Sequence, residues 1–301
     1  MTQAMTVFDR RSVRRHRDRA AASLPRHDFL LREVGERLLD RLDDVRRKFP
    51  LALDLGCHRG DLAGMLGGRG GIETLVQCDL SAPMVGHAPG LRLVACEEAL
   101  PFADASFDLV LSAMSLHWVN DLPGSLLQIR RALRPDGLLL AAMLGGETLR
   151  ELRGALAAAE IAQEGGISPR VSPFADVRDI GNLLQRAGFS LPVVDIDTIT
   201  VSYAEPFALL ADLRGMGETN AVIERRRGLS RRATMLDAVE RYRRDHADAD
   251  GRIPATFQVI SVVAWAPDPT QPKALRPGSA ATRLAEALGG CEIPAGDPAR
   301  P

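Results

Sequence analysis

The stretch "LALDLGCHRGDLAGML", residues 51–66, decides how the chain is expected to fold. An apolar run up to Leu55 is typical of a buried strand, Gly56 and Gly60 bracket a turn, and apolar residues at helical spacing follow. In doubly wound α/β sheets, the first turn from strand to helix brings backbone N–H groups close to a ligand beyond the carboxyl ends of the strands. The stretch therefore predicts a strand, a ligand-binding turn and a helix.

The turn does not match the two common phosphate-binding loops. A GxGxxG dinucleotide turn requires glycine where this chain has His58, and no GK[ST] sequence follows as in a P-loop. With one substitution, "LALDLGCHRG" resembles the first motif, hhDhGxGxG, of the S-adenosylmethionine-dependent methyltransferases. The resemblance implies that Asp54 accepts a hydrogen bond from the cofactor's amino group and that Gly56 and Gly60 let the chain pass beneath it. On this motif alone, an ordinary strand–turn–helix is an equally good interpretation.

His58 need not prevent binding of such a cofactor. No pyrophosphate has to approach the backbone at this position, so a side chain that points away from the ligand is tolerated. We interpret His58 as a packing or solvent-facing residue, since a single histidine in a motif is seldom catalytic.

Composition excludes several classes of function. The chain has 301 residues, 46% of them hydrophobic, which suffices for a large core and one or two domains. Its net charge of −1 gives no electrostatic case for a nucleic-acid partner. No apolar run approaches the roughly 18 residues of a transmembrane helix. Asp9 and Asp18 interrupt the arginine-rich N-terminus, so we interpret that segment as a structural helix and not as a targeting presequence.

The cysteines and histidines predict no metal site. The four cysteines include no CxxC pair and no zinc-like spacing, which favours a reducing compartment. The six histidines include no evident HxD…H set for a non-haem iron centre. His117 and Asp121 could share a helical face, but that spacing alone is weak evidence for a metal.

Short apolar runs alternate with helical segments through the first half of the chain. The runs are "LALDLG", "TLVQCDL", "LRLVAC", "FDLVLSAM" and "GLLLAAML". This alternation predicts a parallel α/β sheet with helices on both faces. Residues 192–203 and 256–266 are expected to be the last strands, with a helical cap between them. The expected domains are a helical N-terminal lead over 1–48, a sheet domain over 49–266 with an insertion at 204–252, and a loosely ordered tail over 267–301.

Further motifs, in the expected order, extend the methyltransferase resemblance. Asp79 closes the second strand, where a carboxylate can accept hydrogen bonds from both ribose hydroxyl groups. "CEEALPFADASFDLVLSAMSLHWV" resembles the run in which an acidic residue contacts the adenine. Cys96 stands where many relatives have aspartate, so Glu97 or Glu98 is expected to serve instead. The full set of predicted cofactor-binding residues is Asp54, Gly56, Cys57, Gly60, Asp79, Leu80, Cys96, Glu97, Glu98 and Met114.

The second half of the chain is similar to a narrower family. "SLHWVNDLPGSLLQIRRALRPDG", "GGETLREL", "AEIAQEGGISPRVSPFADVRDIGNLLQRAGF", "LADLRGMGETNAV" and "DGRIPATFQVISVVAW" resemble, in order, the mitochondrial complex I assembly factors that hydroxylate an arginine of a core subunit, and their bacterial relatives. The resemblance covers about residues 7–288. It implies a seven-stranded, Rossmann-like methyltransferase sheet and S-adenosyl-L-methionine as cofactor.

The resemblance also implies a protein substrate, an arginine of a respiratory complex I subunit, modified by hydroxylation or by methyl transfer. Two alternatives stay open: a malonyl-carrier-protein or small-molecule O-methyltransferase, to which "LHWVNDLP" has a looser resemblance, and a non-catalytic assembly chaperone, which Cys96 and His58 favour. We expect a cytoplasmic protein if the source is bacterial, or one on the mitochondrial matrix face if it is eukaryotic. Peripheral membrane association would come only through the client.

Candidates for the chemistry follow the fourth strand, at the edge where substrate must meet cofactor. We predict that His117 serves as a base or an orienting group and that Trp118 forms a wall of the reaction site. The alternative is that Trp118 belongs to the core and that this stretch is simply a helix N-terminus. For Asn120 and Asp121 we favour the role of helix cap.

Two stretches of the expected insertion carry polar candidates. "GMGETN", residues 215–220, is either a loop whose Glu218 closes over a guanidinium group or a helix C-cap without further function. "ERRRGLSRR", residues 224–232, is interpreted as a solvated helix face in preference to a docking site for an acidic partner.

Overall fold

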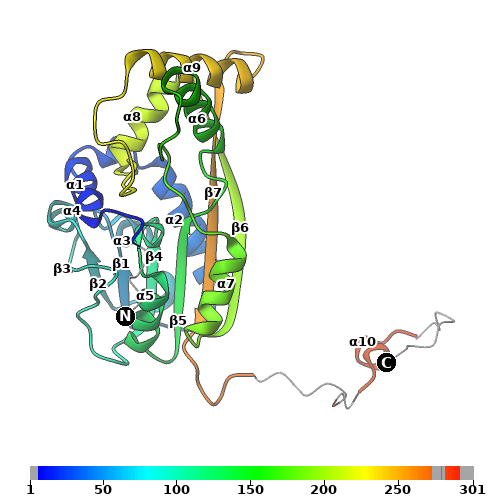
Figure 1. Ribbon diagram of the computed structural model, residues 1–301. Helices are drawn as coiled ribbons and strands as arrows, with labels where there is room; N and C mark the ends of the chain where they lie inside the picture. The colour runs from blue at the N-terminus through cyan, green and yellow to red at the C-terminus, as the bar shows by residue number, and fades with distance from the viewer. Residues whose placement is uncertain (1–5, 273–278, 280–281, 292–301) are drawn as a thin grey trace. The chain divides into compact units, whose positions relative to one another are not determined.

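The computed structural model describes residues 6–272, 279 and 282–291, and its main unit is built on one sheet (Figure 1). The strands are β1 Leu51–Leu55, β2 Thr74–Asp79, β3 Leu91–Val94, β4 Phe107–Ala113, β5 Leu133–Leu144, β6 Ser190–Tyr203 and β7 Ile253–Trp265. Their order is β3-β2-β1-β4-β5-β7-β6. β1 to β5 are parallel, whereas β7 is antiparallel to both β5 and β6. The predicted seven-stranded α/β sheet is confirmed.

Helices precede, separate and follow these strands. In the described residues they are α1 Arg10–Ala20, α2 Phe29–Asp43, α3 Asp61–Met65, α4 Ala82–His87, α5 Leu122–Ala132, α6 Arg150–Glu164, α7 Val177–Arg186, α8 Pro206–Met216, α9 Arg232–His246 and α10 Leu284–Leu288, with short 3₁₀ helices at Leu24–Arg26, Arg69–Gly71 and Leu116–Trp118. The predicted helical lead and helical insertion are therefore both present.

The chain divides after Pro267 into a main unit and a second unit of residues 268–301. Much of the predicted loose tail lies outside the described residues, and the one helix described there is α10. Residues 1–48 belong to the same unit as the sheet. Among the described helices, none has the length and apolar character needed to cross a membrane.

A hydrophobic core lies on each face of the sheet, because alternate residues of a strand point to opposite sides. Leu109 and Leu111 of β4 belong to one core, together with α2, α6 and α8. Val110, between them, belongs to the other core, together with α5 and α7. Burial on both faces explains why the central strands are continuous apolar runs in the sequence.

β6 and β7 form a long ribbon that overhangs the carboxyl edge of the parallel strands (Figure 1). β7 pairs with β5 from Trp265 back to Val259, and its earlier residues pair with β6 alone, as far as Ile253 opposite Tyr203. The insertion that joins Tyr203 to Ile253 thus begins and ends beyond the end of β5. Its helix α9 packs against α6, and α8 packs against α1.

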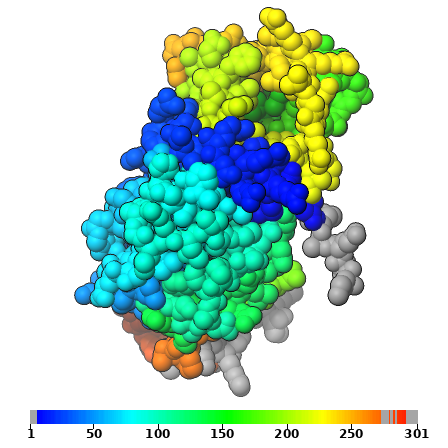
Figure 2. Space-filling view, turned by 90° about the vertical axis from the view of Figure 1, so that its left-hand side faces the viewer, coloured from blue at the N-terminus to red at the C-terminus, as the bar shows by residue number. Residues whose placement is uncertain are grey.

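The N-terminal segment crosses the same edge and lies between the strands and the insertion (Figure 2). The side chain of Asn120 accepts hydrogen bonds from the backbone N–H groups of Val7 (2.8 Å) and Phe8 (2.7 Å). The expectation that Asn120 caps a helix is therefore wrong, because its amide is used to hold this segment. The expectation is confirmed for Asp121, whose carboxylate accepts from the N–H of Gly124 in the first turn of α5 (2.9 Å).

The charged run at 224–232 is not a helix face as expected, since α9 begins only at Arg232. Residues 224–231 form a loop in which two arginines make ion pairs to other segments. Arg225 pairs with Asp9, the cap of α1, at 3.3 Å, and Arg226 pairs with Glu164 at the end of α6. These pairs tie the insertion to the N-terminal segment and to α6.

Candidate functional site

Three buried carboxyl groups lie at the carboxyl ends of β1, β2 and β3. Asp54 is in β1, Asp79 ends β2, and Glu97 follows β3 in the next loop. All three residues are fully buried. Because β1 and β2 are neighbouring parallel strands, Asp54 and Asp79 come to the same edge of the sheet. The structure thus brings together three residues that the sequence motifs singled out.

The guanidinium group of Arg17, from α1, fills the space between two of these carboxylates. One of its nitrogens donates to Asp79 Oδ2 (2.9 Å) and to Glu97 Oε1 (3.1 Å), and the other donates to Ser115 Oγ (3.0 Å). The Arg17 side chain is 2% exposed. Helix α1 therefore covers this edge of the sheet, and a ligand that uses Asp79 must displace the Arg17 side chain. None of the sequence motifs includes Arg17.

The ion pairs keep this network charged. Burial opposes ionisation of Glu97, but Arg17 and Arg10 outweigh it and hold the pKa of this carboxyl at about 2. Burial likewise opposes the charge on Arg17, and the carboxylates of Asp79 and Glu97 outweigh it, so that its pKa is raised. Arg10 also donates to Cys96 Sγ at 3.4 Å, which places the predicted adenine-side cysteine beside the same network.

Asp54 differs from the other two carboxyl groups, because neither of its oxygens has a hydrogen-bond partner among the described residues. Burial, followed by the negative charges of Asp61 and Asp79, raises its pKa to about 8. A buried carboxyl group without a partner is costly, and an ammonium group would satisfy it. Asp54 therefore fits the amino group that the predicted cofactor carries.

The two glycines of the first turn have different surroundings. Gly56 has φ +74°, and a Cβ added there would lie 2.0 Å from Ser115 Oγ, so the backbone at this position packs directly against Ser115. Gly60 has φ +81°, and its added Cβ would lie 2.6 Å from both Gln77 Oε1 and Pro89 Cδ. Gly60 is thus required for packing against the segment before β3, and its place beneath a ligand stays a prediction.

His58 is a buried packing residue and is not solvent-facing. It is 4% exposed and has φ +51°. Its Nε2 lies 3.2 Å from the carbonyl oxygen of Ala113, and its backbone N–H donates to Asp79 Oδ2 (3.2 Å). The side chain also lines a small void together with Met114 and Glu218.

The remaining predicted cofactor residues lie around the same edge. Cys57 is buried in the first turn. Leu80 packs against the cluster that contains Phe8 and Trp118. The carboxylate of Glu98 accepts from the backbone N–H of Asn120 (2.6 Å), so it supports the loop after β4.

Both predicted catalytic residues contact Glu218, which comes from the insertion. His117 and Trp118 lie in the 3₁₀ helix after β4. His117 Nε2 is 3.0 Å from Glu218 Oε2, and Trp118 Nε1 donates to the same oxygen at 3.1 Å. His117 Nδ1 accepts from the backbone N–H of Leu144 (3.4 Å), an arrangement that puts the ring proton on Nε2, toward Glu218. Both ring nitrogens are therefore engaged.

In "GMGETN" the structure confirms the helix C-cap, and closure of Glu218 over a guanidinium group stays a prediction. Gly217, with φ +86°, is the C-cap of α8, as one interpretation held. The next residue, Glu218, turns inward, with a side chain that is 6% exposed. Burial opposes its ionisation, but the interaction with His117 outweighs burial and lowers the pKa of Glu218. The carboxylate of Glu218 is thus fixed and ionised beside His117 and Trp118.

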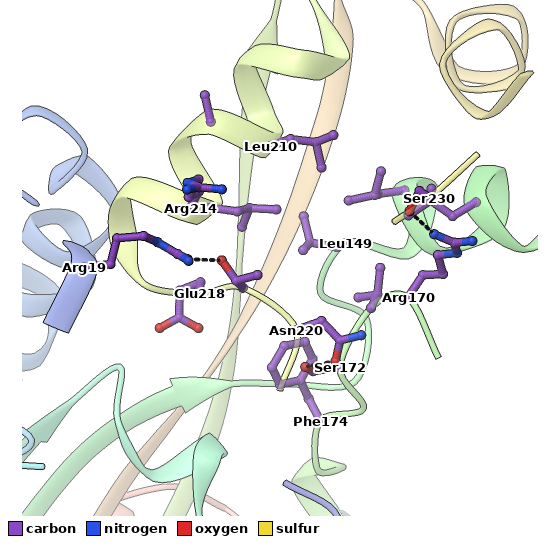
Figure 3. A pocket seen from close by; sticks show the side chains of 16 residues that line it. Arg19, Leu149, Arg170, Ser172, Phe174, Leu210, Arg214, Glu218, Asn220 and Ser230 are labelled. Carbon is purple, nitrogen blue, oxygen red and sulfur yellow. Dashed lines mark hydrogen bonds between the residues drawn. The ribbon is translucent and has the colours of Figure 1, made fainter. Parts of the chain in front are cut away.

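A pocket of about 600 Å³ opens beside Glu218 (Figure 3). Leucines line it from two helices: Leu149, Leu152 and Leu156 from the start and body of α6, and Leu210 and Leu213 from α8. Its volume is within the range of small-molecule and side-chain binding sites. Glu218 lines both this pocket and the small void at His58, so it lies between the pocket and the first turn.

One wall of the pocket is a loop held by Asn220. The Asn220 side chain donates to the carbonyl oxygen of Pro169 (2.8 Å) and contacts Ser172 Oγ (3.2 Å). In the part of the chain that the structure describes, no three His, Cys, Asp or Glu side chains are grouped so that they could hold a metal ion.

Comparisons with known proteins match this architecture. A family model described as a methyltransferase domain matches residues 53–141. The chain is 44% identical over 291 residues to a protein of Danio rerio named arginine-hydroxylase NDUFAF5, mitochondrial, and the match covers 94% of this chain and 90% of that protein. The Homo sapiens protein of the same name is 43% identical, with 94% and 84% covered.

A second group of relatives has a different activity in its name. The malonyl-[acyl-carrier protein] O-methyltransferase of Methylovorus sp. is 36% identical over 281 residues, covering 89% of this chain and 92% of that protein. Among solved structures, the YcgJ protein of Bacillus subtilis superposes with a TM-score of 0.54 at 14% identity, covering 77% of this chain and 99% of that one. This structural likeness concerns the fold alone.

Proposed function

Because the chain belongs to the class I S-adenosylmethionine-dependent methyltransferase superfamily, in the branch of the arginine-hydroxylase NDUFAF5, we propose that it binds S-adenosyl-L-methionine and modifies an arginine of a protein substrate. The family resemblance makes a respiratory complex I subunit, or its precursor, the preferred client. That client would be met at the cytoplasmic face of a bacterial membrane or at the matrix face of the mitochondrial inner membrane.

The buried carboxyl groups would hold the cofactor. Asp54 would accept a hydrogen bond from the amino group. Asp79 would take the ribose hydroxyl groups once the Arg17 side chain is displaced from it, and Glu97 would lie toward the adenine, with Cys96 and Glu98 beside it. When bound, the cofactor supplies an activated methyl group. The unpartnered oxygens of Asp54 support this assignment, because no described residue satisfies them.

Glu218 is the residue that we assign to the substrate. Its carboxylate is fixed by His117 and Trp118 and also lines the pocket. Oε2 already accepts from both side chains, whereas Oε1 accepts only the longer contact from Trp118 (3.3 Å), so Oε1 can accept a hydrogen bond from a guanidinium group. His117 then acts as a positioning residue for Glu218, because both of its ring nitrogens are engaged. Hydroxylation and methyl transfer make the same demand on these residues, which is to hold the arginine beside the reacting centre.

The single observation that carries the proposal is the position of Glu218, between the pocket and the cofactor motifs. The test is mass spectrometry of complex I subunits from cells that lack the gene, complemented with the wild type or with Glu218→Gln. Loss of one oxygen from an arginine in the deletion strain supports hydroxylation, and loss of a methyl group supports transfer. Restoration by the wild type and not by the variant is expected.

The alternatives have their own readouts. If no arginine changes, the arginine-modification proposal is wrong. Isothermal titration then separates a chaperone that does not bind S-adenosyl-L-methionine from an enzyme with another substrate. Release of S-adenosylhomocysteine on incubation with a malonyl-carrier protein would point to carboxyl methylation, the activity named for the second group of relatives.

A further inference from the structure

Two arginines at one end of the pocket have no acidic partner. Arg19 of α1 and Arg214 of α8 line the pocket next to Glu218 and Thr219 (Figure 3). Arg19 donates to Thr219 Oγ1 at 3.3 Å, and within the described residues no carboxylate lies within ion-pair distance of either guanidinium group. Partial burial, together with the charge of Arg214, lowers the pKa of Arg19, which places the two cations close together.

The other charged residues around the pocket are already engaged by other side chains. Arg170, at the opposite end in Figure 3, pairs with Glu160 at 2.7 Å and with Glu164 at 3.7 Å. Glu218 is engaged by His117 and Trp118. Asp212, on α8 beside Arg214, pairs with His27 at 2.7 Å. Arg19 and Arg214 thus bring two positive charges to an end of the pocket whose one nearby carboxylate, Glu218, is not ion-paired with either arginine.

The walls next to these cations are apolar. The apolar part of the lining consists chiefly of the leucines of α6 and α8, with Phe174 and Val171 from the loop between α6 and α7. A ligand that matches both features carries an anionic group beside apolar groups. Arginine is well suited to such a site, because its planar guanidinium group pairs with a carboxylate through two parallel hydrogen bonds.

We propose that the pocket binds a segment of the client protein in which an acidic side chain stands beside apolar ones, with the carboxylate held by Arg19 and Arg214 and the apolar side chains held against the leucines of α6 and α8. The proposal rests on the proposed function, because it takes a protein segment as the substrate. A pocket of about 600 Å³ accommodates only a few side chains. The acidic residue therefore stands within a few residues of the target arginine, which contacts Glu218.

The test uses labelled pentapeptides of sequence LDLRL and LNLRL, whose binding to the cofactor-loaded protein is followed by fluorescence anisotropy. We expect the peptide with aspartate to bind at least about tenfold more tightly than the peptide with asparagine. In the double variant Arg19→Gln, Arg214→Gln this preference is expected to disappear. Arg14→Gln is the matched control, because Arg14 is an exposed arginine of α1 that does not line the pocket.

Three results would overturn the proposal. One is equal binding of the two peptides by the wild type. Another is a preference for aspartate that survives in the double variant. The third is binding of octanoate that depends on Arg19 and Arg214 while neither peptide binds, since the ligand would then be a small carboxylate.

The outcome is separable from that of the proposed function. If the aspartate preference is present while no client arginine changes in mass, the proposed function fails and the acidic subsite stands. If an arginine changes in mass and the wild type shows no preference for aspartate, the subsite fails alone.

Discussion

Replacement of Arg17 by glutamine tests the buried ion pairs that Arg17 makes with Asp79 and Glu97. Arg17 is fully buried and donates hydrogen bonds to Asp79, Glu97 and Ser115. Glutamine can keep a hydrogen bond but removes the charge, and Arg10 then remains as the cation beside Glu97. Removing one partner of a buried ion pair costs about 3–5 kcal/mol. We therefore expect the free energy of unfolding to fall by about 3 kcal/mol at pH 7.

The lowered pKa of Glu97 agrees in direction with this expectation. Its folded-state pKa of about 2 lies below the ordinary value of 4.5, so ionised Glu97 stabilises the fold above pH 4.5, and this contribution is lost as the pH falls toward 2. The shift corresponds to about 3 kcal/mol, of which Arg17 supplies a large part. The difference between the wild type and Arg17→Gln is therefore expected to be full at pH 7 and smaller at pH 3.

Urea unfolding at pH 7 and at pH 3 measures both effects. Arg14→Gln serves as the control, since Arg14 is exposed on the same helix and its replacement is expected to change stability by less than about 0.5 kcal/mol. The reasoning would be refuted if Arg17→Gln lost no more stability than Arg14→Gln at pH 7. A loss that stayed the same at pH 3 would show that the cost comes from packing and not from charge.

Four further outcomes follow from the site. Glu218→Gln is expected to lower kcat/KM for the client by about 10- to 150-fold with the Kd of the cofactor unchanged, and normal kinetics would remove Glu218 from the substrate site. His117→Ala is expected to reduce kcat by up to about a hundredfold through misplacement of Glu218; retained activity with intact cofactor affinity would exclude that role. Because the pKa of Asp54 is about 8, cofactor binding at pH 7 is expected to release a proton, seen as a dependence of the calorimetric enthalpy on the buffer, and Asp54→Asn abolishes it. Gly56→Ala, whose Cβ would meet a serine oxygen at 2.0 Å, is expected to lower the Tm more than Gly165→Ala, which has a similar φ but open space; equal effects would leave only backbone strain as the cause.

The sheet and its acidic edge were predictable because they depend on local patterns. Apolar runs of strand length alternate with helices, and topology then brings the ends of parallel strands together. Asp54, Asp79 and Glu97 each end or follow such a run, so their meeting needed no knowledge of long-range contacts. The five apolar runs of the first half and the two later runs at 192–203 and 256–266 also match the seven strands in number.

Arg17 was not predictable in the same way, because its partners are distant in sequence. Asp79 lies 62 residues away and Glu97 lies 80 residues away. One signal was present: Val13, Arg17 and Ala20 share a helix face, and Val13 and Ala20 are buried. An arginine in the middle of an apolar face indicates an internal partner.

Glu218 shows what a motif can and cannot provide. The glycines of "GMGETN" indicated a turn, and the structure has a helix C-cap there. The partner His117 is 101 residues away, so nothing in the local sequence indicated that the carboxylate turns inward. The pocket likewise needed the structure, because its walls come from α1, α6, α8 and two loops.

The ribbon of β6 and β7 has a consequence for engineering. Residues 204–252 leave and rejoin the sheet at Tyr203 and Ile253, which are paired across the ribbon, so this segment can be exchanged as a graft without cutting any strand. Besides the packing of α9 on α6 and of α8 on α1, the segment contacts the remainder through Glu218, which holds His117 and Trp118, and through the ion pairs of Arg225 and Arg226. A chimaera that received the equivalent piece of a carboxyl methyltransferase would inherit a new specificity wall, while Asp54 and Asp79 stayed untouched.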